Sequence, residues 1–261
     1  MTKRSMISIG FIMLLTIVTV HAVAETDACG KTMTPEQKIQ RALDVQAVTN
    51  VASRHEYYHS ALMHAEEFRD IWAQNTAGVS WTNNTDRYVG VADLKRFMID
   101  GLPKDKTGIL WVHNMSTPVI EIAGDGKTAK GVWFSAGTVS GSMGGTPMAA
   151  WTSEKYGIDF VKENGKWKIW HLHTFVDYYT PTDKRWIDEG GNMNSREVES
   201  KRKDMENKLQ TGVKEEPGVS FDAMRPTERG EYYIGYDLKT VPVMAPKPPE
   251  PYCSFDKATS F

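Results

Sequence analysis

Residues 117–133 read TPVIEIAGDGKTAKGVW, and residues 156–173 read YGIDFVKENGKWKIWHLH. In each stretch, two runs rich in β-branched and aromatic residues flank a short segment with glycine and aspartate or asparagine. This is the pattern of a β-hairpin. Together the two stretches predict at least three antiparallel strands, which must bury one face against another element.

Helical patterns come before these strands. Residues 35–72 carry apolar residues near helical spacing, and Thr34 followed by Pro35 is a helix start signal. Two helices with a break near residues 60–64 fit the pattern equally well, and residues 91–100 predict a further short helix. We therefore expect an α+β domain with helices packed on one face of an antiparallel sheet.

The C-terminal third has a different character. Residues 195–210 form a highly charged helical stretch, and residues 242–251 are rich in proline and predicted to be extended. We expect one folded domain over residues 25–181 and an extension over residues 182–261, which wraps that domain or a neighbouring subunit.

The first 24 residues resemble a secretory signal. Lys3 and Arg4 precede an apolar stretch over residues 7–20, and residues 22–24 read Ala-Val-Ala. A chain that loses this leader would be secreted or periplasmic and would keep no membrane anchor. The two cysteines, Cys29 and Cys253, could then pair in an oxidising compartment, although two unpaired thiols fit the spacing as well.

Composition excludes some classes of function. The chain has 261 residues, of which 40% are hydrophobic and 25% charged, enough for one sizeable core. Its net charge of −2 comes from interspersed positive and negative residues, so we expect no nucleic-acid partner.

The histidines are the main candidates for chemistry. On a helix, residues four apart share a face, so Val51, His55 and His59 align, with Tyr58 alongside. Burial of the imidazoles would lower their pKa values and favour the neutral ring, which can accept a proton near pH 7. A half-buried structural pair is the alternative.

Strand alternation gives two further expectations. On the last strand, a period of two places His171 and His173 on the same side as Trp167 and Ile169, facing the core. Upstream, strict alternation would place His113 on the outer face with Glu121, so an inward His113 needs a register break, for which Pro118 is suited.

Two aromatic residues complete the candidate set. Trp133 and Tyr156 fall on strand faces opposite neighbouring lysines and could line an aromatic pocket, although plain core packing is the commoner role for such residues.

Residues 55–59 also read His-Glu-Tyr-Tyr-His, which matches the H-E-x-x-H signature of zinc peptidases. We do not favour a peptidase, because Glu56 could lie on the wet side of the helix and Glu67 is too near in sequence to supply a third ligand from another element. A different metal site, with His55 and His59 facing His171 and His173, stays open as an alternative.

The two hairpin stretches, with the His113 strand before them, resemble the SnoaL-like branch of the nuclear transport factor 2-like superfamily over residues 38–180. The resemblance implies a cone in which N-terminal helices close over a curved antiparallel sheet around a pocket. Scytalone dehydratase, the bile-acid dehydratase and diarylpropane formaldehyde lyase are of this type, and the resemblance therefore implies catalysis without a cofactor.

Many such enzymes use a tyrosine and an aspartate of the first helix together with a histidine at the position of His113. Here His55 takes the tyrosine position, while the aspartate has no clear counterpart.

From these features we expect an exported lyase that acts on a hydrophobic, aromatic or polycyclic alcohol by dehydration or by carbon–carbon cleavage with release of formaldehyde. His55 is the expected base and His113 the expected acid or oxyanion donor, with Tyr58, His59 and His173 orienting them. Trp133, Tyr156 and His171 are expected to contact substrate. The alternatives are a non-catalytic exported binding protein and a histidine-ligated metalloenzyme, and a homo-oligomer is expected in each case.

Overall fold

The computed structural model describes residues 25–101, 105–143, 146–197, 199–200 and 224–261, with the side chains of residues 142, 143 and 146 excepted. The expected leader and most of the charged stretch over residues 195–210 lie outside the described residues.

Two helices form the N-terminal part, as in the alternative with a break near residues 60–64. Helix α1, Pro35–Ser60, begins with a capping box in which Thr34 and Gln37 exchange side-chain and backbone hydrogen bonds. It ends at a short break that contains Leu62, whose φ of 55° is left-handed, and α2, His64–Ile71, follows. The predicted short helix is also confirmed, as α3, Val91–Lys95, which continues into a single π-helical turn, Arg96–Asp100.

A curved, mostly antiparallel sheet forms the rest of the domain, so the α+β class is confirmed. In the part of the chain that the structure describes it has seven strands, in the order β3-β4-β5-β6-β1-β2-β7. Both predicted hairpins are present, and only the β1–β6 pairing is parallel. The strands are β1 Ser80–Asn83, β2 Asp86–Val89, β3 Leu110–Ile122, β4 Thr128–Met143, β5 Thr146–Glu163, β6 Lys166–Pro181 and β7 Glu228–Arg229.

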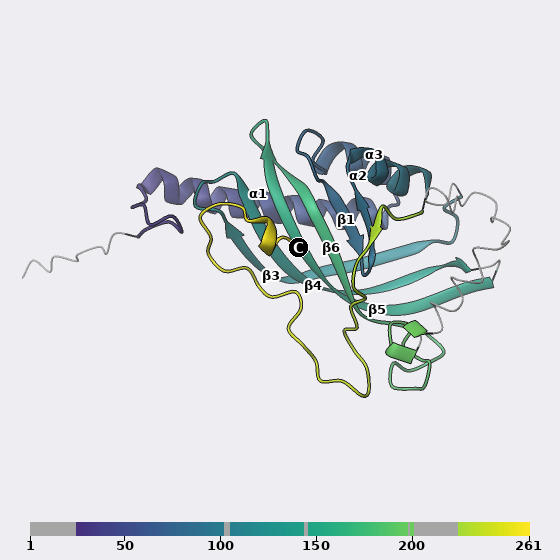
Figure 1. The fold of residues 1–261 in the computed structure, drawn as a ribbon. Coiled ribbons are helices and arrows are strands. Elements are labelled where there is room, and N and C mark those ends of the chain that lie inside the picture. The colour runs from purple at the N-terminus through teal and green to yellow at the C-terminus, as the bar shows by residue number, and fades with distance from the viewer. Residues whose placement is uncertain (1–24, 102–104, 144–145, 198, 201–223) are drawn as a thin grey trace, which may run out of the picture.

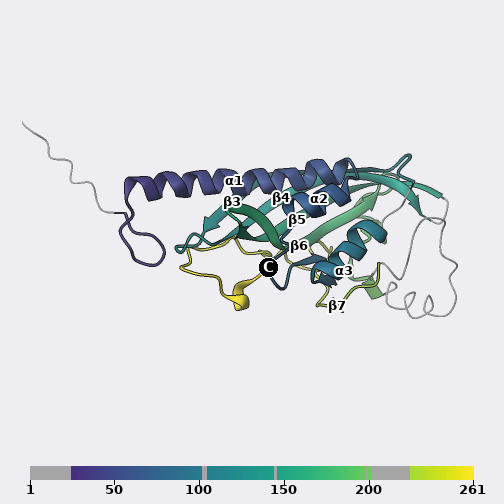
Figure 2. The same cartoon turned by 90° about the horizontal axis from the view of Figure 1, so that it is seen from above.

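The two faces of the sheet have different covers. Helix α1 runs along one face, and the C-terminal segment, residues 230–261, lies on the other, as Figures 1 and 2 show. The core lies between α1 and the sheet, where Val48 and Ala52 of the helix are fully buried. Among the described residues, no helix has the length and hydropathy that a membrane span requires.

A bulge in β3 decides the direction of its side chains. The pairing with β4 shifts between Ser116 and Val119, where Thr117 has a φ of 49°. Because of this extra residue, His113 can point toward the α1 side although strict alternation would forbid it. The register break expected near Pro118 is confirmed.

A second bulge, in β6, contradicts one of the sequence predictions. Phe160 pairs with Ile169, but Asp159 pairs with His171, so Trp170 is an extra residue in the strand. Trp167 and Ile169 face α1 as predicted, and the indole Nε1 of Trp167 donates to Asp44 of the helix at 2.8 Å. Beyond the bulge the parity is reversed, and His171 and His173 face the opposite side. Their predicted inward orientation is wrong.

The C-terminal segment wraps its own domain. Cys29 and Cys253 form a disulfide, and the carbonyl oxygens of Tyr252 and Cys253 accept hydrogen bonds from the turn between β3 and β4. At the chain end, the Phe261 ring lies against Gly157, where a Cβ atom would approach the ring to 2.5 Å. Glycine at this position therefore allows the tail to dock.

We expect the disulfide to hold the tail in place, because it links residues 224 positions apart in the sequence. Changing Cys29 and Cys253 to serine together should lower the free energy of unfolding by about 2–5 kcal/mol. The main reason is that the unfolded chain gains conformational entropy when the cross-link is removed. Urea unfolding with and without reductant measures this loss. A wild-type protein whose unfolding midpoint does not respond to reductant would contradict it.

Candidate functional site

A cavity opens between the end of α1, the start of α2 and the α1-facing side of the sheet. Its volume is about 360 Å³, a size typical of small-molecule sites. Large aromatic side chains form much of its wall, and a small set of polar groups points into it. The lining includes His59, His64, Trp81, Tyr88, Phe97, Trp111, His113, Val139, Glu154, Tyr156, Thr174, Val176 and Tyr179.

His113 and Glu154 form a buried pair in this cavity. His113 Nδ1 lies 3.2 Å from Glu154 Oε1, and the Thr152 hydroxyl donates to the same oxygen at 2.9 Å. Burial by itself would lower the pKa of His113, but the Glu154 carboxylate outweighs it, and the pKa is raised above its usual value. Opposite His113 in the register is Gly137, where a Cβ atom would lie only 3.1 Å from the imidazole.

His59 has the opposite electrostatic setting. Burial, together with the nearby His55, His113 and His64, holds the pKa of His59 well below its usual value. Its ring centroid lies 5.4 Å from that of His113 and 5.3 Å from that of Trp111. In this pair of neighbouring imidazoles, His113 therefore favours the protonated form and His59 the neutral form.

Tyr156 is placed as predicted, because it lines the cavity and is only 3% exposed. Burial, followed by the charges of Glu154 and Glu56, raises its pKa well above the usual value, so its hydroxyl keeps its proton. Trp133, its register partner on β4, instead packs edge-on against Phe160 in the core and is not among the lining residues.

His55 is fully buried behind His59, with ring centroids 5.6 Å apart, and does not line the cavity. Its Nδ1 lies 2.7 Å from Glu67 Oε1. Burial would lower the pKa of His55, but the Glu67 charge raises it overall. The base role expected of His55 does not fit this position.

The remaining candidates lie away from the cavity. The Tyr58 hydroxyl donates to Asp70 Oδ2 at 2.8 Å, so this side chain joins α1 to α2. His171 Nδ1 lies 2.9 Å from Asp159 Oδ2 on the tail side of the sheet, and His173 Nε2 lies 3.1 Å from the Asn84 carbonyl oxygen. The structure therefore does not bring His171 and His173 to the same site as His55 and His59.

Sequence analysis missed several polar residues of this region. Glu56, expected on the wet side of α1, is 9% exposed, and neither of its carboxylate oxygens has a hydrogen-bond partner among the described residues. The spacing could have predicted the burial of Glu56, because Val48, Ala52 and Glu56 follow one another at intervals of four residues on the buried face of α1. Glu154 likewise lies two residues before Tyr156 on one strand face.

The family model of the SnoaL-like domain matches residues 40–173. A hexachlorocyclohexane dehydrochlorinase of type 3 from Novosphingobium barchaimii has 14% identity and a TM-score of 0.45, and the alignment covers 58% of this chain and 99% of that protein. A protein provisionally assigned as scytalone dehydratase, from Novosphingobium aromaticivorans, has 12% identity, a TM-score of 0.45 and coverage of 57% and 93%. No protein with a curated description matches the sequence.

The buried Glu56 gives a prediction about stability and pH. Burial raises the pKa of its carboxyl from 4.5 to about 7, against the opposing effects of His55 and His113. The folded state therefore binds the proton more tightly than the unfolded state, and ionisation of Glu56 costs stability as the pH rises from about 4.5 through about 7.

Glu56→Gln removes this cost. The free energy of unfolding of the variant, relative to wild type, should be greater at pH 8 than at pH 4.5 by up to about 3 kcal/mol. Urea unfolding at both pH values measures the difference, with Glu231→Gln as the exposed control. If the two variants respond equally to pH, Glu56 does not carry the shifted pKa.

Proposed function

The chain belongs to the SnoaL-like family, and on that premise we propose that it is a lyase acting by acid–base catalysis on a hydrophobic, aromatic or polycyclic alcohol. The reaction is elimination of water, or cleavage of a carbon–carbon bond with release of formaldehyde. Both reactions require one group to remove a proton and another to protonate or stabilise the oxygen that gains charge.

The observation that carries the proposal is the buried His113–Glu154 pair at an aromatic cavity. Its Nδ1–Oε1 distance of 3.2 Å and the raised pKa of His113 favour an imidazolium, which can donate a proton to a leaving hydroxyl or to an oxyanion. The Tyr156 hydroxyl, which stays protonated, is a second donor in the same wall. The neutral His59 imidazole can accept the proton that the substrate loses.

The walls favour a flat, apolar substrate. Trp81, Tyr88, Phe97 and Trp111 contribute aromatic surface to a cavity of about 360 Å³. Aromatic faces and edges bind rings by burial and by offset or edge-on contacts, so an aryl or polycyclic alcohol suits this lining better than a sugar or an ionic metabolite.

We also propose that the protein works outside the cytoplasm. The expected leader over residues 1–24 and the Cys29–Cys253 disulfide support this, because disulfides persist in oxidising compartments.

The proposal is tested by substrate screening with matched variants. The mature protein is incubated with a panel of aryl and polycyclic alcohols, and products are followed by mass spectrometry for loss of water and by a formaldehyde assay. His113→Gln should lower kcat by about 10²–10⁴-fold, because it removes the proton donor. Glu154→Gln should act in the same direction, and His173→Gln, which changes a histidine on the tail side of the sheet, should leave turnover unchanged.

Two results would contradict this. Equal losses in His113→Gln and His173→Gln would mean that the cavity is not where the chemistry occurs. Tight binding of aryl alcohols without turnover, unaffected by His113→Gln, would instead support a non-catalytic binding protein.

A further inference from the structure

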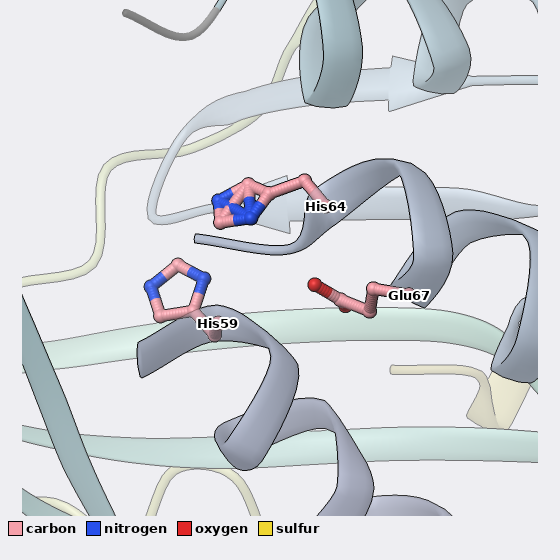
Figure 3. A group of neighbouring side chains, drawn as sticks. All are labelled: His59, His64 and Glu67. Atoms are coloured by element: carbon pink, nitrogen blue, oxygen red, sulfur yellow. The ribbon is translucent and has the colours of Figure 1, made fainter. Parts of the chain in front are cut away.

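Three potential metal ligands converge where α1 ends and α2 begins. His59 is in the last turn of α1, while His64 and Glu67 lie in the first turn of α2. Figure 3 shows the two imidazoles stacked, with the Glu67 carboxylate directed into the space beside them. One ligand atom from each residue lies within 4.8 Å of the other two.

These side chains have buried polar atoms without partners. His64 is 4% exposed, yet neither of its ring nitrogens has a hydrogen-bond partner among the described residues. His59 Nδ1 and Glu67 Oε2 also have no hydrogen-bond partner among the described residues, and Glu67 is fully buried. Buried polar groups are nearly always satisfied. Each of the three neighbouring side chains has at least one unmatched atom, which points to an ion or polar ligand held between them.

The Glu67 carboxylate is also held in the manner of a metal ligand. Its Oε1 accepts a hydrogen bond from Trp72 Nε1 at 2.9 Å and lies 2.7 Å from His55 Nδ1. Both contacts use the same oxygen, which leaves Oε2 free. Ligating carboxylates are typically oriented by outer hydrogen bonds of this kind.

The chemistry of the donor set fits zinc. Two imidazoles and one glutamate, with a fourth position left open, form one of the common sets at catalytic zinc sites.

We propose that His59, His64 and Glu67 bind a divalent transition-metal ion, for which zinc is the best match. Ligand atoms around tetrahedral zinc lie about 3.4 Å apart for bonds of about 2.1 Å. In the structure the three ligand atoms lie up to 4.8 Å apart, so the side chains must rotate modestly when the ion binds. Because His59 and His64 line the same cavity as His113, an ion held by these residues would border that cavity.

This set differs from both metal sites considered in the sequence analysis. His55 is not a ligand but orients Glu67, so the site is not that of an H-E-x-x-H peptidase. Glu67, judged too near in sequence to come from another element, lies in a separate helix because the chain breaks after Ser60. His171 and His173 lie on the other face of the sheet.

The binding site does not depend on the proposed lyase activity, although it would alter the mechanism. With an ion bound, His59 would be a ligand and could no longer accept the substrate's proton. Hydroxide, which such an ion generates from water by lowering its pKa, would supply the base instead. The expected cofactor-independent reaction would then be replaced by a metal-assisted one.

Zinc binding tests the inference directly. The mature chain, without a histidine tag, is stripped with chelator and titrated with zinc chloride in a calorimeter, and elemental mass spectrometry measures the metal in unstripped protein. We expect one ion per chain and a melting temperature that rises with zinc. His64→Ala should weaken zinc binding by more than about 100-fold, the upper end of what loss of an outer contact costs.

Matched variants separate ligation from folding. Neither ring nitrogen of His64 has a hydrogen-bond partner among the described residues, so His64→Ala should fold as wild type by circular dichroism. Glu67→Gln, by contrast, should lose both zinc and some stability. His173→Gln, which keeps the same histidine count as His64→Ala, should bind zinc normally.

The outcomes also separate the two proposals. The proposed zinc site is overturned if no zinc binds at one equivalent, or if wild type and His64→Ala bind zinc with equal affinity. The proposed function would survive either result if the zinc-free protein shows lyase turnover. Zinc bound by these three residues in a protein without lyase activity supports the site and leaves the proposed function without support.

Discussion

Two β-bulges, one near Pro118 in β3 and one at Trp170 in β6, decide which way the histidine side chains of these strands point, and the site depends on that direction. In β3 the bulge near Pro118 turns His113 toward α1, and in β6 the extra Trp170 turns His171 and His173 away from it. One inserted residue reverses the face of every later residue in a strand. The histidines of these two strands therefore lie in different surroundings. His113 of β3 lines the cavity, whereas His171 of β6 contacts Asp159 and Ser260 beneath the C-terminal segment.

Burial of polar groups beneath α1 sets the electrostatics of the cavity. Glu56, Glu67 and Glu154 lie among four imidazoles in an interior where charges are weakly screened, so burial and the neighbouring charges together set the pKa values of these histidines. The pKa values of His55 and His113 are raised by the carboxylates of Glu67 and Glu154, whereas burial lowers the pKa values of His59 and His64. This contrast provides a proton donor and a proton acceptor from one residue type.

Most of the fold was predictable from the sequence, whereas only three of the eight candidate site residues, His59, His113 and Tyr156, line the cavity. Both hairpins, the cap at Thr34 and the break before His64 follow from local residue preferences. The bulge at Trp170 has no comparable signal, because no proline or glycine marks it, and so His171 and His173 were assigned to the wrong face. Strands β1 and β2 are four residues each, too short for a clear period. The disulfide depends on tertiary contact, which spacing cannot supply.

The central claim is that ligand binds on the α1 side of the sheet, next to His113. The most direct measurement is histidine side-chain NMR during titration with 2-naphthol, a simple aromatic alcohol. Binding in the cavity predicts shifts in the His113 and His59 ring signals, while those of His171 and His173 stay constant. Shifts confined to His171 and His173 would place the ligand on the tail side and contradict the account.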